Sequence, residues 1–75
     1  MNKQRRKEIK EQIKLIEQAK SNLESILSDE EYYFDNMPEN LQGSMRGEES
    51  QEAIDLLMES TDTLQEIIDN LSELT

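Results

Sequence analysis

Apolar residues recur along most of this chain at alternating spacings of three and four residues, the period of one face of an α-helix. The first series predicts a helix over about residues 3–35. Its inward line, which we call the seam of that helix, contains Ile9, Ile13, Ile16, Leu23, Leu27 and Phe34 and is interrupted by Lys20 and Glu30. Further apolar residues widen the seam on one side to the breadth of a bundle helix: Leu15, Ala19, Ile26 and Tyr33.

A second series predicts a helix over about residues 45–74. Its seam contains Ile54, Leu57, Thr61, Leu64, Ile68 and Leu71, with Ala53, Leu56, Met58, Ile67 and Leu74 beside it. Residues 36–44 form the connection, with a short turn starting at Pro38, because a proline excludes the residue before it from the α region. The second helix starts near Ser44 or Gly47, and Ser44 is the better N-cap by residue type.

Two helices of about 30 residues joined by a short loop should fold back on each other. The sequence therefore predicts an all-α fold, a coiled-coil-like antiparallel two-helix hairpin, with residues 1–75 as a single domain. Charge favours this topology, because residues 1–20 carry seven basic and three acidic side chains, and residues 21–75 carry one and fifteen. The basic start of one helix then lies beside the acidic end of the other, so that the two ends compensate each other and offset the unfavourable interaction of each with its own helix dipole.

The predicted hairpin has a thin core. A chain of 75 residues is near the size at which one hydrophobic core becomes marginal. In addition, four large apolar side chains lie off the seams and would be exposed to water unless another surface covers them: Leu15, Ile26, Leu56 and Ile67. We therefore expect self-association, most simply a homodimer that forms a four-helix bundle, or docking onto a partner protein.

The composition argues against several classes of function. The chain has no cysteine and no histidine, so no set of nucleophile, base and orienting group can be assembled, and we expect a protein that is not an enzyme and has no cofactor. A net charge of −10 opposes direct binding to nucleic acid. No apolar run approaches the roughly 20 residues of a membrane span, and none follows the basic N-terminal stretch as in a signal peptide. A cytoplasmic protein of a bacterial host, without membrane contact, is expected.

Eight carboxylates follow one another at spacings of 4, 3, 4, 3, 4, 3 and 4, and no Lys or Arg occurs after Arg46. This acidic stripe consists of Glu48, Glu52, Asp55, Glu59, Asp62, Glu66, Asp69 and Glu73. It has three interpretations, because neighbouring like charges on a helix face each cost a few tenths of a kcal/mol and need a reason to persist. The stripe is a solvated outer face, or it mimics phosphates and enters a basic groove, or, least supported without histidine, it binds metal.

The connection has the most distinctive sequence. Its string Pro38-Glu39-Asn40-Leu41-Gln42-Gly43-Ser44, with a Tyr/Asp/Asn segment before it and Ala53-Ile54-Asp55 and Ile68-Asp69-Asn70-Leu71 after it, resembles a family of small acidic proteins encoded by phages and integrated elements of Gram-positive bacteria. The resemblance covers roughly residues 30–71. It implies a short accessory phage gene and no catalytic residue.

Residues of the connection also have a structural interpretation. Tyr32, Tyr33 and Phe34 would plug the closed end of the hairpin, Asn40 and Gln42 would bond free backbone groups, Leu41 would pack down and Ser44 would cap. As binding residues, the candidates are Tyr33, Asn40, Leu41 and Arg46 in this region and Asp55, Glu59, Asp62, Glu66 and Asp69 in the stripe.

These observations favour a non-enzymatic acidic protein-interaction module, used by a phage or mobile element to bind a host or phage protein. The alternative is a DNA- or RNA-mimicking inhibitor of a nucleic-acid-binding defence or replication protein, of the anti-CRISPR or anti-restriction type. A purely structural role in assembly is a third hypothesis.

Overall fold

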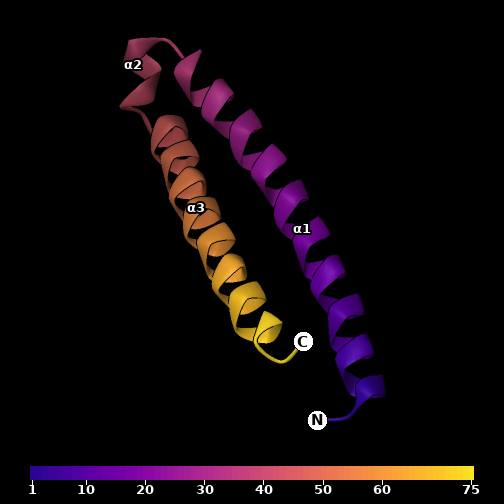
Figure 1. Cartoon of the computed structure of the whole chain (residues 1–75). Helices are drawn as coiled ribbons and strands as arrows, with labels where there is room; N and C mark the ends of the chain where they lie inside the picture. Colours follow the sequence, from indigo (N-terminus) through magenta and orange to yellow (C-terminus); the bar gives the residue numbers. More distant parts are fainter.

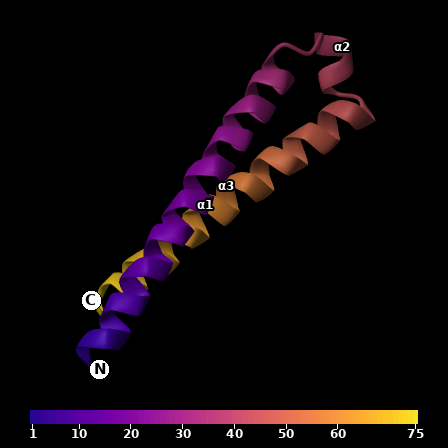
Figure 2. The same cartoon turned by 90° about the vertical axis from the view of Figure 1, so that its right-hand side faces the viewer.

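Two long helices, α1 (Lys3–Asp35) and α3 (Met45–Ser72), run antiparallel and pack together in the computed structural model, which describes residues 1–75 (Figure 1). A one-turn helix, α2 (Glu39–Gln42), lies between them at what we call the closed end, and both termini lie at the opposite, open end. The two long helices cross at an angle, because they lie closer together at the closed end in Figure 1 and farther apart there in Figure 2. The Cα trace extends over 58 × 15 × 12 Å. The predicted all-α hairpin is confirmed, including the turn that starts at Pro38.

Local capping explains where α1 begins and ends. The Asn2 side-chain oxygen accepts a hydrogen bond from the backbone N–H of Arg5 at 2.8 Å and so satisfies a free donor of the first turn. At the other end, Asn36 donates from its side-chain nitrogen to the Tyr32 carbonyl at 2.8 Å. Pro38 follows within two residues and prevents the helix from continuing.

The predicted seams face each other. Ile13, Ile54, Thr61 and Ile68 are buried, and every other predicted seam residue is half-buried: Ile9, Ile16, Leu23, Leu27, Phe34, Leu57, Leu64 and Leu71. No large side chain is completely buried. Two helices cannot enclose a side chain on all sides, so each seam residue keeps part of its surface in contact with water. The core is as thin as the sequence predicts.

Lys20 and Glu30 do not break the seam of α1 but continue it. Both side chains are half-buried between the helices, at the spacing of the apolar seam residues. The only side-chain ion pair joins Lys20 Nζ to Glu24 Oε1 at 3.7 Å, within one helix. The basic start of α1 and the acidic end of α3 do lie at the same end of the hairpin (Figure 1), but no ion pair joins them. Any compensation between these two ends therefore acts through distance and not through contact.

Small residues allow α2 to pack closely against the start of α3. Gly47 and Ser50 are buried there, and a Cβ atom on Gly47 would lie 2.0 Å from the Gln42 carbonyl oxygen. Gln42 fixes the turn, because its side-chain nitrogen donates to the carbonyls of Phe34 (3.1 Å) and Met37 (3.2 Å), as predicted. Two other predicted bonds are wrong: Ser44 is the N-cap residue but its hydroxyl donates to the Leu41 carbonyl, and Asn40 takes no part in the network.

Replacing Gly47 by alanine should destabilise the protein by about 1–3 kcal/mol, because the new methyl group collides with backbone and not with a flexible side chain. Gly43→Ala is the matched control: it adds the same methyl group where no atom lies within 4 Å, and we expect no loss of stability. Urea titration followed by circular dichroism measures both. Equal stability of the two variants would contradict the close packing of α2 on α3.

Replacing Lys20 by leucine should raise the free energy of unfolding by about 1–2 kcal/mol, because a half-buried seam position then carries an apolar side chain. Lys14→Leu makes the same change at an exposed position of the same helix and should shift stability by no more than about 0.5 kcal/mol. Thermal unfolding compares the two. A destabilised Lys20→Leu variant would show that the lysine stabilises the seam through its charge.

Candidate functional site

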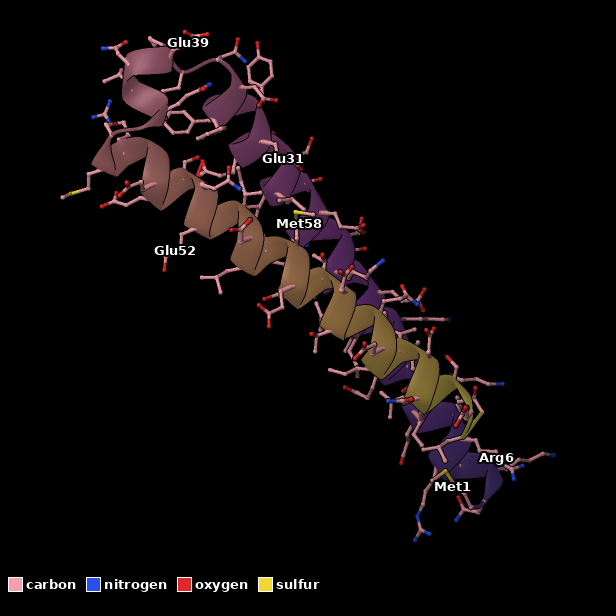
Figure 3. The ribbon with its side chains drawn as sticks, turned by 90° about the vertical axis from the view of Figure 1, so that its left-hand side faces the viewer. Met1, Arg6, Glu31, Glu39, Glu52 and Met58 are labelled. Atoms are coloured by element: carbon pink, nitrogen blue, oxygen red, sulfur yellow. The ribbon has the colours of Figure 1, made fainter.

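The acidic stripe lies on the outer surface of α3. All eight carboxylates are exposed, and Glu52, for example, points away from α1 (Figure 3). Over 25 residues of helix the stripe is about 37 Å long, at roughly 1.5 Å per residue. The structure therefore confirms that these residues share one exposed surface, including the candidates Asp55, Glu59, Asp62, Glu66 and Asp69.

No cation neutralises the stripe. Its only side-chain hydrogen bonds come from neutral amides on the same helix: Gln51 donates to Asp55 at 3.1 Å, and Gln65 donates to Asp69 at 2.9 Å. No ion pair involves any of the eight carboxylates. Nowhere in the chain do three or more acidic side chains converge in the geometry of a metal site. The stripe is an extended row of separate charges.

A cleft opens where α1, the connection and the start of α3 meet. This closed-end cleft has a volume of about 360 Å³ and is lined by Tyr32, Tyr33, Asn36, Met37, Pro38, Leu41 and Arg46. Three of the four candidates from this region, Tyr33, Leu41 and Arg46, therefore share one surface. Asn40 is exposed and does not line the cleft.

The tyrosines do not plug the hairpin, so that prediction is wrong for both. Tyr32 and Tyr33 are 73% and 46% exposed, and only Phe34 is half-buried between the helices. The reason is rotational: when one of three consecutive helical residues occupies the seam, the other two lie to the side of it or behind it. The closed end thus presents two aromatic side chains to solvent.

Arg46 separates the closed-end cleft from a second one. The second cleft, of about 430 Å³, is lined by Glu30, Tyr33, Arg46, Glu49 and Ser50. Arg46 is the only basic residue after Lys20, and its guanidinium forms no ion pair. Ser50, which is buried, has a hydroxyl group without a hydrogen-bond partner. Arg46 and Tyr33 border both clefts, so they are the central residues of the closed end.

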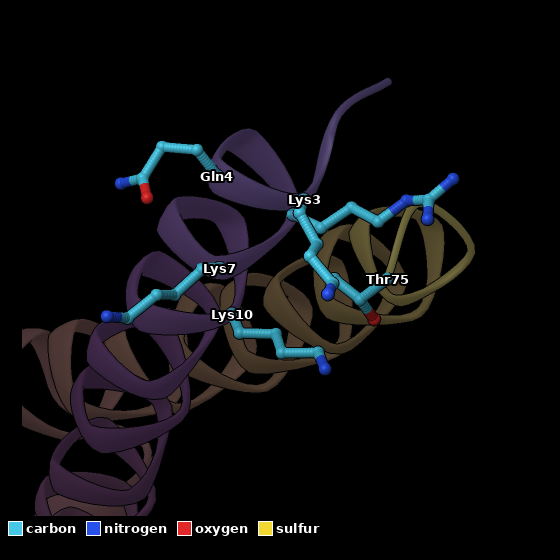
Figure 4. A pocket seen from close by; sticks show the side chains of 6 residues that line it. Lys3, Gln4, Lys7, Lys10 and Thr75 are labelled. Atoms are coloured by element: carbon cyan, nitrogen blue, oxygen red, sulfur yellow. The ribbon is translucent and has the colours of Figure 1, made fainter.

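At the open end, basic side chains surround the C-terminal residue. Lys3, Gln4, Arg6, Lys7, Lys10 and Thr75 line a cleft of about 470 Å³. Lys3 and Lys10 extend towards Thr75, and Gln4 and Lys7 point away from it (Figure 4). The sequence predicts that these cations pair with carboxylates at the end of α3, but none of them forms an ion pair in the structure.

One long side of the hairpin carries an apolar face that sequence reasoning described only in part. Its members are Leu15, Ala19, Ile26 and Tyr33 of α1, Ala53, Leu56 and Ile67 of α3, and Leu74 in the turn after α3. Because the helices are antiparallel, residues that come one position before a seam residue lie on the same side of the pair in either helix. Ile26 and Ile67 are examples. The periodicity of each helix contains this signal, but only the topology joins the two flanks.

The opposite side of the hairpin is polar. With Glu30 and Ser50 counted in the seams, the residues that follow every second seam position lie on this side: Lys10, Glu17, Glu24, Glu31, Gln51, Met58, Gln65 and Ser72. Met58 is the one large apolar side chain among them. The molecule therefore has three distinct surfaces along its length: an apolar face on one side, a polar side opposite to it, and the acidic stripe on the back of α3.

No family model matches the chain, and no match was found among curated proteins or solved structures. None of its helices combines the length and the apolar character needed to cross a membrane.

Changing Glu59 and Glu66 together to lysine should leave the fold intact and raise its stability slightly, by up to about 1 kcal/mol at low salt. Each lysine replaces repulsion from two stripe neighbours, three and four residues away, with attraction. Thermal unfolding at low and high salt measures the effect, which should shrink as salt screens exposed charges. A destabilised variant would mean that these carboxylates make contacts that an exposed face does not provide.

Proposed function

We propose that this protein is a non-enzymatic interaction module that binds another protein through its closed-end cleft. The observation that carries the proposal is the gathering of Tyr33, Leu41 and Arg46 around one exposed, largely apolar cleft. Tyrosine and arginine are the residue types that most often dominate binding energy at protein interfaces. Tyr32 enlarges the aromatic surface, and Arg46 supplies the only cation of that end besides Lys20.

Composition supports a binding role over a catalytic one. The chain has neither cysteine nor histidine, the residues that most often serve as nucleophile and as general base. The clefts contain arginine, lysine, tyrosine and carboxylates, but no hydrogen-bonded pair of nucleophile and base. Recognition, and not turnover, fits these residues.

The biological setting is part of the proposal. The likeness of the string Pro38–Ser44 to small acidic proteins of phages and integrated elements supports a mobile-element protein that acts in the cytoplasm of a bacterial host. The partner is then a protein of the host or of the phage. Four residues of this string, Pro38 to Leu41, lie at or beside the closed-end cleft, and two of them, Pro38 and Leu41, line it, so the most distinctive part of the sequence coincides with the proposed site.

We also propose that the module is a dimer that forms a four-helix bundle. The apolar face leaves large side chains of both helices exposed, among them Leu15, Ile26, Leu56 and Ile67, and no large side chain within the hairpin is completely buried. A second hairpin on this face would remove those side chains from water.

The alternative function is mimicry of DNA or RNA, which would inhibit a nucleic-acid-binding protein of defence or replication. One observation favours it: the stripe is about 37 Å of exposed carboxylates without a single ion pair. Such a rod would fit a basic groove, and its field would accelerate the approach of a cationic partner. The two hypotheses use different surfaces, so they can be separated by substitution.

The test is affinity capture from a lysate of the bacterium that carries the gene, at low and at high salt, with quantitative mass spectrometry. The double variant Leu41→Asp, Arg46→Ala alters the closed-end cleft. It should reduce the captured partner at least about tenfold, because loss of a hot-spot residue typically costs 2 kcal/mol or more. Capture by the unaltered protein should persist at high salt.

The matched variant is the double reversal Glu59→Lys, Glu66→Lys on the stripe, which should retain the partner. Circular dichroism of each variant shows that the helices remain. The reverse result, loss of the partner with the stripe variant and by added salt alone, would favour nucleic-acid mimicry and contradict the proposed role of the cleft.

A further inference from the structure

The two sides of the hairpin differ sharply in apolar surface. Ile26, on the apolar face, is 52% exposed, and Leu15, Leu56, Ile67 and Leu74 are exposed beside it. On the polar side, Met58, at 50% exposure, stands alone among charged and amide side chains. The members of the apolar face extend from residue 15 to 33 on α1 and from residue 53 to 74 on α3 and the turn that follows it. Asn22, Ser60, Thr63 and Asn70 stand between them, but large exposed apolar side chains gathered on one side of a protein mark an interaction site.

A second copy of the chain matches this face in length and in chemistry. The Cα atoms of the hairpin extend 58 Å along its length and 15 Å across it. A rectangle of these dimensions has an area on the order of the ~800 Å² per partner that stable interfaces bury. A two-fold dimer presents the same patch on both copies, so an apolar face of one copy meets an apolar face of equal length on the other.

Two face-to-face orientations are compatible with two-fold symmetry. In one, the closed ends of both copies lie together. In the other, the closed end of each copy lies against the open end of its partner. The apolar contacts are similar in both, because each face has large side chains near either end: Leu15 and Ile67 towards the open end, and Ile26 and Leu56 towards the closed end.

Charge distinguishes the two orientations. The open half, residues 1–18 and 61–75, carries six basic and seven acidic side chains, a net charge of −1. The closed half, residues 19–60, carries two basic and eleven acidic side chains, a net charge of −9. Joining the closed ends would set two strongly negative halves against each other, and the reversed orientation sets each of them against a nearly neutral half. Like charges at short range repel, most strongly at low salt.

We infer that two copies dock through their apolar faces in the reversed orientation, with the closed end of each copy against the open end of the other. The inference rests on the proposed function only in that it takes the protein to be a dimer. It adds the interface residues and the direction of docking. One consequence is that the open end of one copy lies at the rim of the closed-end cleft of the other, so a binding partner there meets a surface made by both copies.

The interface is tested with a matched pair of substitutions. Ile26→Lys places a charge on the apolar face and should raise the dimer dissociation constant at least about tenfold. Met58→Lys places the same charge on the opposite side, at a residue of equal exposure, and should leave the dissociation constant unchanged. Light scattering and sedimentation measure both, and circular dichroism confirms that they fold. Equal effects of the two changes would overturn the apolar face as the interface.

The orientation is tested with a single spin label on each copy. The chain has no cysteine, so Asn40→Cys at the exposed closed end takes one label per copy, and Glu73→Cys at the open end provides a second, independent site. The reversed orientation predicts label separations of several tens of ångströms, approaching the 58 Å length of the hairpin. Joined closed ends predict about 10–20 Å, one or two interhelical spacings.

The outcomes separate the inference from the function. Short separations at both sites in a dimer would overturn the reversed orientation and leave dimerisation and partner binding in place. A protein that remains monomeric in light scattering would overturn the inference and the proposed dimer together. Partner capture through the closed-end cleft is measured separately, so its failure would contradict the proposed function without touching the dimer.

Discussion

The contact between the seams of α1 and α3 is the constraint on which the rest of the structure depends. Along most of its length each long helix has only the other as a neighbour, so the residues that stabilise the pair must fall on one line, at spacings of three and four. Near the closed end the seam residues of α3 are small, Gly47 and Ser50, and their small size allows α2 to pack against α3. Where the seam passes Lys20, the half-buried amine has only an intrahelical partner at 3.7 Å. The same seam therefore positions α2 through its small residues and contains a charged side chain at Lys20.

A single seam also determines what the remaining surfaces are. In a two-helix pair the positions beside the seam are reached by solvent unless something else covers them, so their chemistry reflects the surroundings of the hairpin and not its core. On one side these positions carry mostly charged or amide residues, and on the other about half of them are apolar, with Leu15, Ile26, Leu56 and Ile67 exposed. The acidic stripe occupies the back of α3, where it cannot weaken the seam. Repulsion along the stripe is therefore tolerated, because the seam holds the helix from its other side.

Periodicity predicted the parts of the fold that depend on local sequence. The seam residues, the bounds of α1, the turn at Pro38 and the exposure of the stripe all follow from spacing and from the properties of proline. The closed end was harder to predict, because its contacts depend on the path of residues 36–38. The bond from the Ser44 hydroxyl to the Leu41 carbonyl is one such contact. The exposure of Tyr32 and Tyr33, in contrast, follows from the helix period once Phe34 occupies the seam. The apolar face could not be read from one helix, because Ile26 and Ile67 become neighbours of one surface only through the antiparallel topology.

Charge and apolar contact have separate tasks in the proposed module. The field of a chain with a net charge of −10 extends beyond the surface by about a Debye length, roughly 8 Å at physiological salt, and selects which proteins approach quickly. In the proposed complex, the lifetime of binding would depend instead on desolvated contacts such as those of Tyr33 and Leu41, since differences in affinity lie mainly in dissociation rates. A partner with a basic rim and an apolar anchor would use both, with the stripe speeding its arrival and the cleft slowing its departure. Arg46 agrees with this division. As the one cation beside the cleft, it would repel basic groups of a partner from the cleft, so that these groups would contact the surrounding carboxylates instead.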